Sequence, residues 1–278
     1  MKAVLLMAHM DASRSERFHI SLKTPAGELS TSVEVPTNLV PITAIVSLTR
    51  RLGEEATALE TAQIQDAGQR ISCQKGCAAC CRMLVPVSPP EAFALKALVE
   101  ALPDERRQAV LDKLNSARAR LEEAGLLARL IALAETGRPL SDEEMEPINR
   151  DYYALRMACP FLEHESCSIY EDRPAACREL LVTTPADLCD DLINNPVQPV
   201  PAPLRVGTVL ALLWSELKET TPMLIPLPMA LAWAEQHKAD GQGMWRGAHL
   251  LERMLNSMWR ILEQEFAHRA AGQATPKS

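Results

Sequence analysis

Residues 73–81 read CQKGCAACC, a run of four cysteines with the spacing C-x3-C-x2-C-C. A second group follows at Cys159, Cys167 and Cys177, and the eighth and last cysteine is Cys189. No cysteine lies in the first 72 or the last 89 residues of the 278-residue chain. The cysteines therefore mark residues 73–189 as the region that carries the chemistry of the chain.

Metal or redox chemistry explains this clustering better than disulfide bonds do. Apolar residues make up 47% of the chain, which is long enough to bury a stable core without disulfide crosslinks. The N-terminal MKAVLLMAHM contains an apolar segment but lacks the length and the small-residue cleavage site of a signal peptide. We therefore expect a cytoplasmic location, where reducing conditions keep thiols free.

Charge and hydropathy argue against two classes of partner. The formal net charge is −7, so no overall basic field attracts a nucleic-acid backbone. The densest apolar stretch, residues 206–213, is much shorter than the roughly 18 to 20 apolar residues that span a bilayer. We expect neither nucleic acid nor a membrane as a partner.

The sequence predicts a mainly α-helical protein with a loop-rich cysteine centre and a small N-terminal β-hairpin. Apolar and polar residues alternate over residues 18–35 on both sides of Pro25-Ala26-Gly27, which indicates two strands and a tight turn. Ala, Leu and Glu are abundant, and aromatic residues make up only 4% of the chain. Helices are expected at about 52–70, 89–102, 104–137 with a bend near Gly125, 141–157, 204–218, 227–238 and 243–268.

Three regions follow from this pattern. Residues 1–70 form an N-terminal extension with the hairpin and one helix, and residues 71–190 form the cysteine domain with a helical insertion at 89–157. A connector with four prolines, residues 194–203, leads to C-terminal helices at 204–270 that pack on the core. The last helix carries a broad apolar face, which is more typical of core packing but could also receive a protein partner.

The spacing of the first cluster has a geometric consequence if the segment is α-helical. Cys77 then follows Cys73 by about one turn, and Cys80 and Cys81 follow Cys77 likewise, so the sulfurs share a face. Cys80 and Cys81 point about 100° apart on such a helix and need not bind the same ion. His164 could add a nitrogen ligand, although a lone histidine in a Glu-His-Glu loop is usually exposed.

Four sequence elements occur together in this chain. They are the run at 73–81, CPFL at 159–162, CSIY at 167–170 and RPAACR at 173–178. In their order and chemistry the chain resembles the YkgJ-like cysteine-cluster family of zinc- or iron-chelating domains, over about residues 71–180. The resemblance implies a chelating set of Cys73, Cys77, Cys80, Cys81, Cys159, Cys167 and Cys177, and it leaves Cys189 outside.

Thiolates suit zinc and iron, including iron–sulfur clusters. Seven cysteines exceed the needs of one tetrahedral site, so either two sites exist or some thiols are structural or reactive. Lys75, Arg173 and Arg178 lie within or beside the clusters and could offset the thiolate charge. Arg173 has an alternative role in a salt bridge with Glu171 or Asp172.

The function expected from this reading is metal binding with a redox or iron-handling role. A metal-stabilised protein-interaction module without catalysis is the main alternative, so whether the protein is an enzyme stays open. Radical S-adenosylmethionine enzymes and flagellin lysine methylases share the cysteine spacing, but the former place it in a repeated βα barrel that this sequence does not predict. Cys77-Ala-Ala-Cys80 has the spacing of a thiol-redox pair without its strand–helix context.

Overall fold

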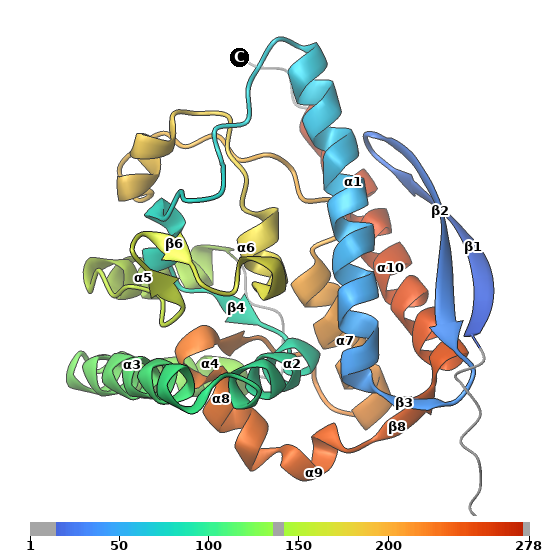
Figure 1. The fold of residues 1–278 in the computed structure, drawn as a ribbon. Helices are drawn as coiled ribbons and strands as arrows, with labels where there is room; N and C mark the ends of the chain where they lie inside the picture. Colours follow the sequence, from blue (N-terminus) through green and yellow to red (C-terminus); the bar gives the residue numbers. More distant parts are fainter. Residues whose placement is uncertain (1–14, 136–141, 275–278) are drawn as a thin grey trace, which may run out of the picture.

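The computed structural model describes residues 15–135 and 142–274, and Figure 1 shows their arrangement. Strands β1 (Ser15–Thr24) and β2 (Gly27–Pro36) form an antiparallel hairpin, as predicted. Every second residue of the later part of β1 and of β2 is buried, including Ile20, Leu22 and Val33. This alternation gives the two-stranded ribbon one apolar face, which must be covered by helices.

The helices that cover the hairpin build the first of three apolar cores. They are α1 (Val46–Asp66), α7 (Val206–Lys218) and α10 (Gly247–Ala274). In Figure 1 the hairpin and α10 lie on one side of α1, and the segments around α6 lie on the other. A short strand, β3 (Leu39–Pro41), precedes α1 and pairs with β8 (Met244–Arg246), which precedes α10. This pairing joins the segments that lead into the two helices.

A second core lies beneath the cysteine segments. It is formed by α2 (Pro89–Glu100), α3 (Asp104–Glu123) and α8 (Leu227–Gln236), with β4 (Pro86–Val87) pairing with β7 (Ile225–Pro226). Helix α2 begins with the capping box of Ser88 and Glu91, which satisfies its first N–H groups. Phe161 and Ile169, which flank Cys167, are buried in this core. The cysteine loops are therefore anchored on packed helices.

A third core lies within the helical insertion, between α3, α4 (Leu126–Glu135) and α5 (Asp142–Ala154). Helix α3 ends before Gly125, whose φ of +68° is readily adopted by glycine, and α4 (Leu126–Glu135) follows. The predicted bend at Gly125 is thus a break between two helices. Helix α5 (Asp142–Ala154) packs beside α4 through Tyr152, while the start predicted at Ser141 lies outside the described residues.

Loops and short elements fill the space between these cores. They include β5 (Leu162–Glu163), β6 (Ser166–Cys167), α6 (Ala175–Glu179), α9 (Lys238–Gly241) and 3-10 helices at Ala79–Arg82, Tyr170–Asp172 and Ala186–Asp191. Every sheet among the described residues has two strands. The prediction of a mainly α-helical protein with a small N-terminal hairpin is confirmed. Within the described ranges, no helix combines the length and apolar character needed to cross a bilayer.

Candidate metal centre

The first cysteine cluster is a series of turns and not an α-helix. The N–H of Cys77 donates to the carbonyl of Gln74 over 3.0 Å, and Gly76 between them has a φ of +94°. Only Ala79–Arg82 is helical, as a 3-10 turn. The condition for a shared α-helical face of the four sulfurs is therefore not met. The backbone makes a turn at Gly76, before Cys80 and Cys81 are reached.

The second cluster comes from three different elements. Cys159 follows α5 in an irregular segment, Cys167 ends β6, and Cys177 lies in the middle of α6. The turn between β5 and β6 carries His164, which is exposed and has a φ of +49°. All seven cysteines implied by the family resemblance are half-buried, and all eight cysteines of the chain are free thiols.

Main-chain contacts bring the two clusters together. The N–H of Cys159 donates to the carbonyl of Cys81 over 2.7 Å. The sulfur of Cys73 accepts the N–H of Val182 at 3.3 Å, just beyond the helix that carries Cys177. At the tip of the β5–β6 hairpin, Glu165 accepts two hydrogen bonds from Arg82, at 2.8 and 3.1 Å. Segments far apart in sequence thus lie against each other at the cysteine clusters.

Burial makes the thiols of this site reluctant to ionise. It raises the pKa of Cys159 to about 11, and it also raises the pKa of Cys73, Cys167 and Cys177. The pKa of Cys80 is raised by a hydrogen bond with Cys81 and by burial. The charge of Cys80 in turn raises the pKa of the four others, so Cys80 lies within electrostatic reach of each. A bound cation would reverse this balance and favour the thiolates.

The structure adds Cys189 to this neighbourhood. Cys189 is buried in the 3-10 helix Ala186–Asp191, which packs against the 3-10 helix Ala79–Arg82. Burial raises its pKa to about 11, with further contributions from Cys73, Cys77 and Cys80. The residues around Cys189 match none of the four sequence elements, so the family resemblance did not include it. The signal available was the count of eight thiols, which equals two sets of four.

Two cations stack on one aromatic ring beside the thiols. The guanidinium of Arg173 lies 3.9 Å from the ring centre of Tyr170, and the ammonium of Lys75 lies 5.0 Å from the same centre. Arg173 lowers the pKa of Cys73, Cys80, Cys167 and Cys177 against the stronger effects that raise them. In the described part of the chain, Arg173 makes no salt bridge with Glu171 or Asp172. The geometry therefore supports the other predicted role of Arg173, which is to offset the charge of the thiolates.

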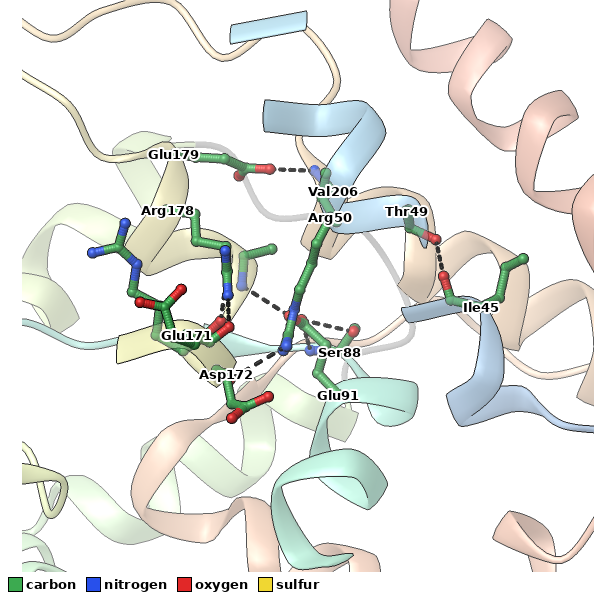
Figure 2. Close-up of polar contacts among 12 residues, drawn as sticks. Ile45, Thr49, Arg50, Ser88, Glu91, Glu171, Asp172, Arg178, Glu179 and Val206 are labelled. Atoms are coloured by element: carbon green, nitrogen blue, oxygen red, sulfur yellow. Dashed lines mark hydrogen bonds and ion pairs between the residues drawn. The ribbon is translucent and has the colours of Figure 1, made fainter. Parts of the chain in front are cut away.

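A buried carboxylate holds the start of α6, the helix that carries Cys177. Glu91 is fully buried, and its Oε1 accepts the N–H of Ala175 at 2.8 Å and the guanidinium of Arg50 at 3.0 Å. Its Oε2 accepts the hydroxyl of Ser88 at 2.9 Å. Figure 2 shows these contacts converging between α1, α2 and α6. One side chain therefore fixes the cysteine helix to both neighbouring cores.

The residues present fit a thiolate-bound metal by their chemistry. Within residues 15–135 and 142–274, no three or more His, Cys, Asp or Glu side chains are grouped closely enough to hold a metal ion. The sulfur donors nevertheless suit zinc or iron. The Nε of Arg173 is buried and has no hydrogen-bond partner in the described structure, and the charge of Arg173 favours the thiolate form of Cys73, Cys80, Cys167 and Cys177. Metal binding therefore requires the thiol side chains to move closer together. The positive charges of Arg173 and Lys75 already lie beside them.

Comparison with known families agrees with this geometry. Residues 72–190 match the family model CxxCxxCC, described as "Putative zinc- or iron-chelating domain". This stretch is therefore similar to CxxCxxCC domains. The resemblance stated from the four elements is confirmed, and the match extends through Cys189. The match covers less than half of the chain, and comparisons with curated proteins and with solved structures find no match.

Proposed function

We propose that the cysteine domain binds zinc or iron through the thiolates of its two clusters. The proposed ligands are Cys73, Cys77, Cys80, Cys81, Cys159, Cys167 and Cys177. The observation that carries this proposal is the contact between Cys159 and Cys81, which joins the clusters at 2.7 Å through the main chain. A further support is that the charge of Cys80 raises the pKa of Cys159, Cys167 and Cys177.

The number of thiols favours more than one metal atom. A tetrahedral site takes four ligands, so a single zinc or iron ion would leave at least three of the seven proposed ligands unused. Two ions, or an iron–sulfur cluster with additional thiols beside it, use the set more fully. Cys189 is the natural eighth member, because it lies within electrostatic reach of Cys73, Cys77 and Cys80.

The partial exposure of the centre supports a redox or iron-handling role. The seven thiols are half-buried, and a site that exchanges metal or electrons must be reachable from solvent. Arg173 and Lys75 supply positive charge beside the thiols, which stabilises a centre with several thiolates. Bound iron would supply one-electron chemistry at this position, and these residues would set the local charge around it.

A structural role is the second candidate, and the position of α6 favours it. Cys177 packs against the second core while Ala175 packs against the first, so a metal at Cys177 would link the two cores. Metal binding would then contribute folding free energy to a region that has little regular secondary structure. In that case the domain would act as a metal-stabilised platform for a protein partner.

Anaerobic purification of the full chain, followed by metal analysis, distinguishes these roles. An iron-handling or redox centre predicts stoichiometric iron, visible absorption that bleaches on reduction and, for a cluster, acid-labile sulfide. A structural centre predicts colourless protein with stoichiometric zinc that resists reductant. Protein that holds neither metal in stoichiometric amount after anaerobic purification and reconstitution would contradict both.

A further inference from the structure

A second site lies next to the cysteine centre, on the other side of α6. A cavity of about 260 Å³, open to solvent on one side, is lined by α1, α6 and the first residue of α7. Arg50 and Thr57 line it from α1, Arg178 and Glu179 from α6, and Val206 from α7. Cys177 of the same short helix packs instead against the second core. The cavity and the thiols therefore lie next to each other, and Arg173, which acts on the thiols, also lines the cavity.

Hydrogen-bond donors exceed acceptors around this cavity. Each arginine has five N–H groups. Arg50 uses three, two on Glu91 and one on the carbonyl of Asp172, and Arg178 uses three, on Glu54 and on the carbonyls of Glu171 and Arg173. Two donors therefore remain on each. The cavity carboxylate of Glu179 already accepts the N–H of Val206.

The lining of the cavity carries three arginines, Arg50, Arg173 and Arg178, and two carboxylates, Glu54 and Glu179. The side chains of Arg50 and Arg178 are only 10% and 14% exposed, so water screens them little. Arg50 pairs with buried Glu91, and Arg178 pairs with Glu54, a lining residue whose side chain is 49% exposed. Arg173 also lines the cavity and has no carboxylate partner among the described residues. Glu179 is the remaining negative group.

The arrangement of these groups suits an anion. Figure 2 shows Arg50 and Arg178 lying side by side, with Glu179 and the start of α7 above them. Helix α7 has 13 residues, and the positive end of its dipole faces the cavity at Val206. Planar guanidinium groups pair well with the oxygens of a carboxylate or a phosphate. The volume suits a small molecule.

We propose that this cavity binds a small molecule through its carboxylate or phosphate group, with Arg178 as the principal donor and Arg50 and Arg173 as supporting charges. Thr57, buried on α1, offers a hydroxyl to the same ligand. The site does not depend on a metal at the cysteines. It sits directly behind the helix of Cys177, so a small anionic ligand would bind within one helix diameter of the proposed centre.

Calorimetric titration of the full chain with inorganic phosphate, and separately with succinate, tests this site. We expect saturable binding of one or both probes; phosphate alone indicates a phosphate-bearing ligand and succinate alone a carboxylate. Arg178→Gln should weaken the binding by about tenfold or more, because it removes a charged donor. Ala58→Phe leaves every arginine in place but fills the cavity from the exposed face of α1, and it should abolish binding.

Arg51→Gln is the matched control. Arg51 is an exposed arginine on the same helix that pairs with Glu55 and does not line the cavity, so its loss should leave the affinity unchanged. Circular dichroism checks that each variant is folded. The proposal is overturned if neither probe binds saturably to the unmodified protein, or if Ala58→Phe binds as tightly as Arg51→Gln.

Discussion

Glu91 is the residue on which three helices depend. Its carboxylate joins Arg50 of α1, Ser88 at the start of α2 and Ala175 at the start of α6, and it is fully buried. Removing one partner of a buried charge pair leaves the other charge without compensation in a medium of low polarity. Without this carboxylate, the guanidinium of Arg50, the hydroxyl of Ser88 and the N–H of Ala175 would each lose a hydrogen-bond acceptor.

We predict that Glu91→Ala lowers the free energy of unfolding by about 3 to 5 kcal/mol, the range for breaking a buried ion pair. Chemical denaturation measures the change. Glu55→Ala is the control, since Glu55 also pairs with an arginine on α1 but is partly exposed, and its loss should cost no more than about 0.5 kcal/mol. Equal effects of the two substitutions would show that Glu91 is not a structural hub.

Arg173 is the residue whose role depends most on a metal. Its buried Nε has no acceptor in the described structure, and its guanidinium stacks on Tyr170 beside the thiols. The sequence left two roles for this residue, and the absence of a salt bridge with its acidic neighbours in the described residues favours the one near the cysteines. Sequence alone could not decide, because ion pairing depends on side-chain direction.

We predict that Arg173→Gln weakens metal retention by about tenfold, as expected when a charged partner of the ligands is lost. Competition with a chromophoric chelator measures the affinity. Arg106→Gln removes an exposed arginine that lies 3.6 Å from Glu163 and should leave the affinity unchanged. If Arg173→Gln retains the metal as well as this control does, the positive charge beside the thiols has no part in binding.

At the scale of elements, the contact between α1 and α7 is unusually close. A methyl group at Gly53 would lie 2.2 Å from Cγ2 of Val206, so only glycine permits the present spacing. Val206 also begins α7 and gives its N–H to Glu179 of α6. The packing of α1 on α7 therefore sets the position of α6 as well.

We predict that Gly53→Ala destabilises the protein by about 1 to 3 kcal/mol through overpacking, in spite of the higher helix propensity of alanine. Thermal or chemical unfolding measures the change. Adding Val206→Ala should recover part of the loss, because it removes the clashing methyl group. Gly207→Ala is the control, since its nearest neighbours lie at ordinary contact distances of 3.9 and 4.0 Å. A stabilising effect of Gly53→Ala would contradict the close approach.

Elements with local signals were predictable from sequence, and those fixed by distant contacts were not. The hairpin follows from alternation around Pro25-Ala26-Gly27, and the start of α2 follows from Ser88 and Glu91. Helix α1 begins at Val46, before the expected residue 52, because the 3-10 turn Ile42–Ile45 is buried in the core and leads directly into it. The first cysteine cluster is not an α-helix, because it is tied to residues beyond Leu180.

At the scale of the whole molecule, the cysteine domain lies between two apolar cores. The hairpin, α1, α7 and α10 supply most of the first core, and the helical insertion supplies much of the second. The division into three regions drawn from sequence stays a prediction. The chemistry of thiolate ligands predicts that the two clusters converge, and the contact of Cys159 with Cys81 brings their segments together. The approach of Cys189 to them depends on the path of the loop after α6.

We predict that removing the metal loosens the cysteine segments while leaving the hairpin core intact. The first core is stabilised by extensive apolar burial, whereas residues 72–83 and 159–191 have few regular hydrogen bonds. Hydrogen exchange before and after chelation measures this difference. Exchange should rise in the cysteine segments and change little in β1 and β2. A uniform rise across the chain would indicate global unfolding, and no rise anywhere would show that the metal adds no local stability.

X-ray absorption spectroscopy of the anaerobically purified full chain tests the central claim most directly, because it reports the atoms bound to the metal. We predict stoichiometric zinc or iron with sulfur neighbours at about 2.3 Å. Cys80→Ser and Cys177→Ser, one from each cluster, should each lower the sulfur coordination or the metal content. A metal surrounded only by oxygen and nitrogen, or sulfur coordination that survives in both variants, would contradict a centre shared by the two cysteine clusters.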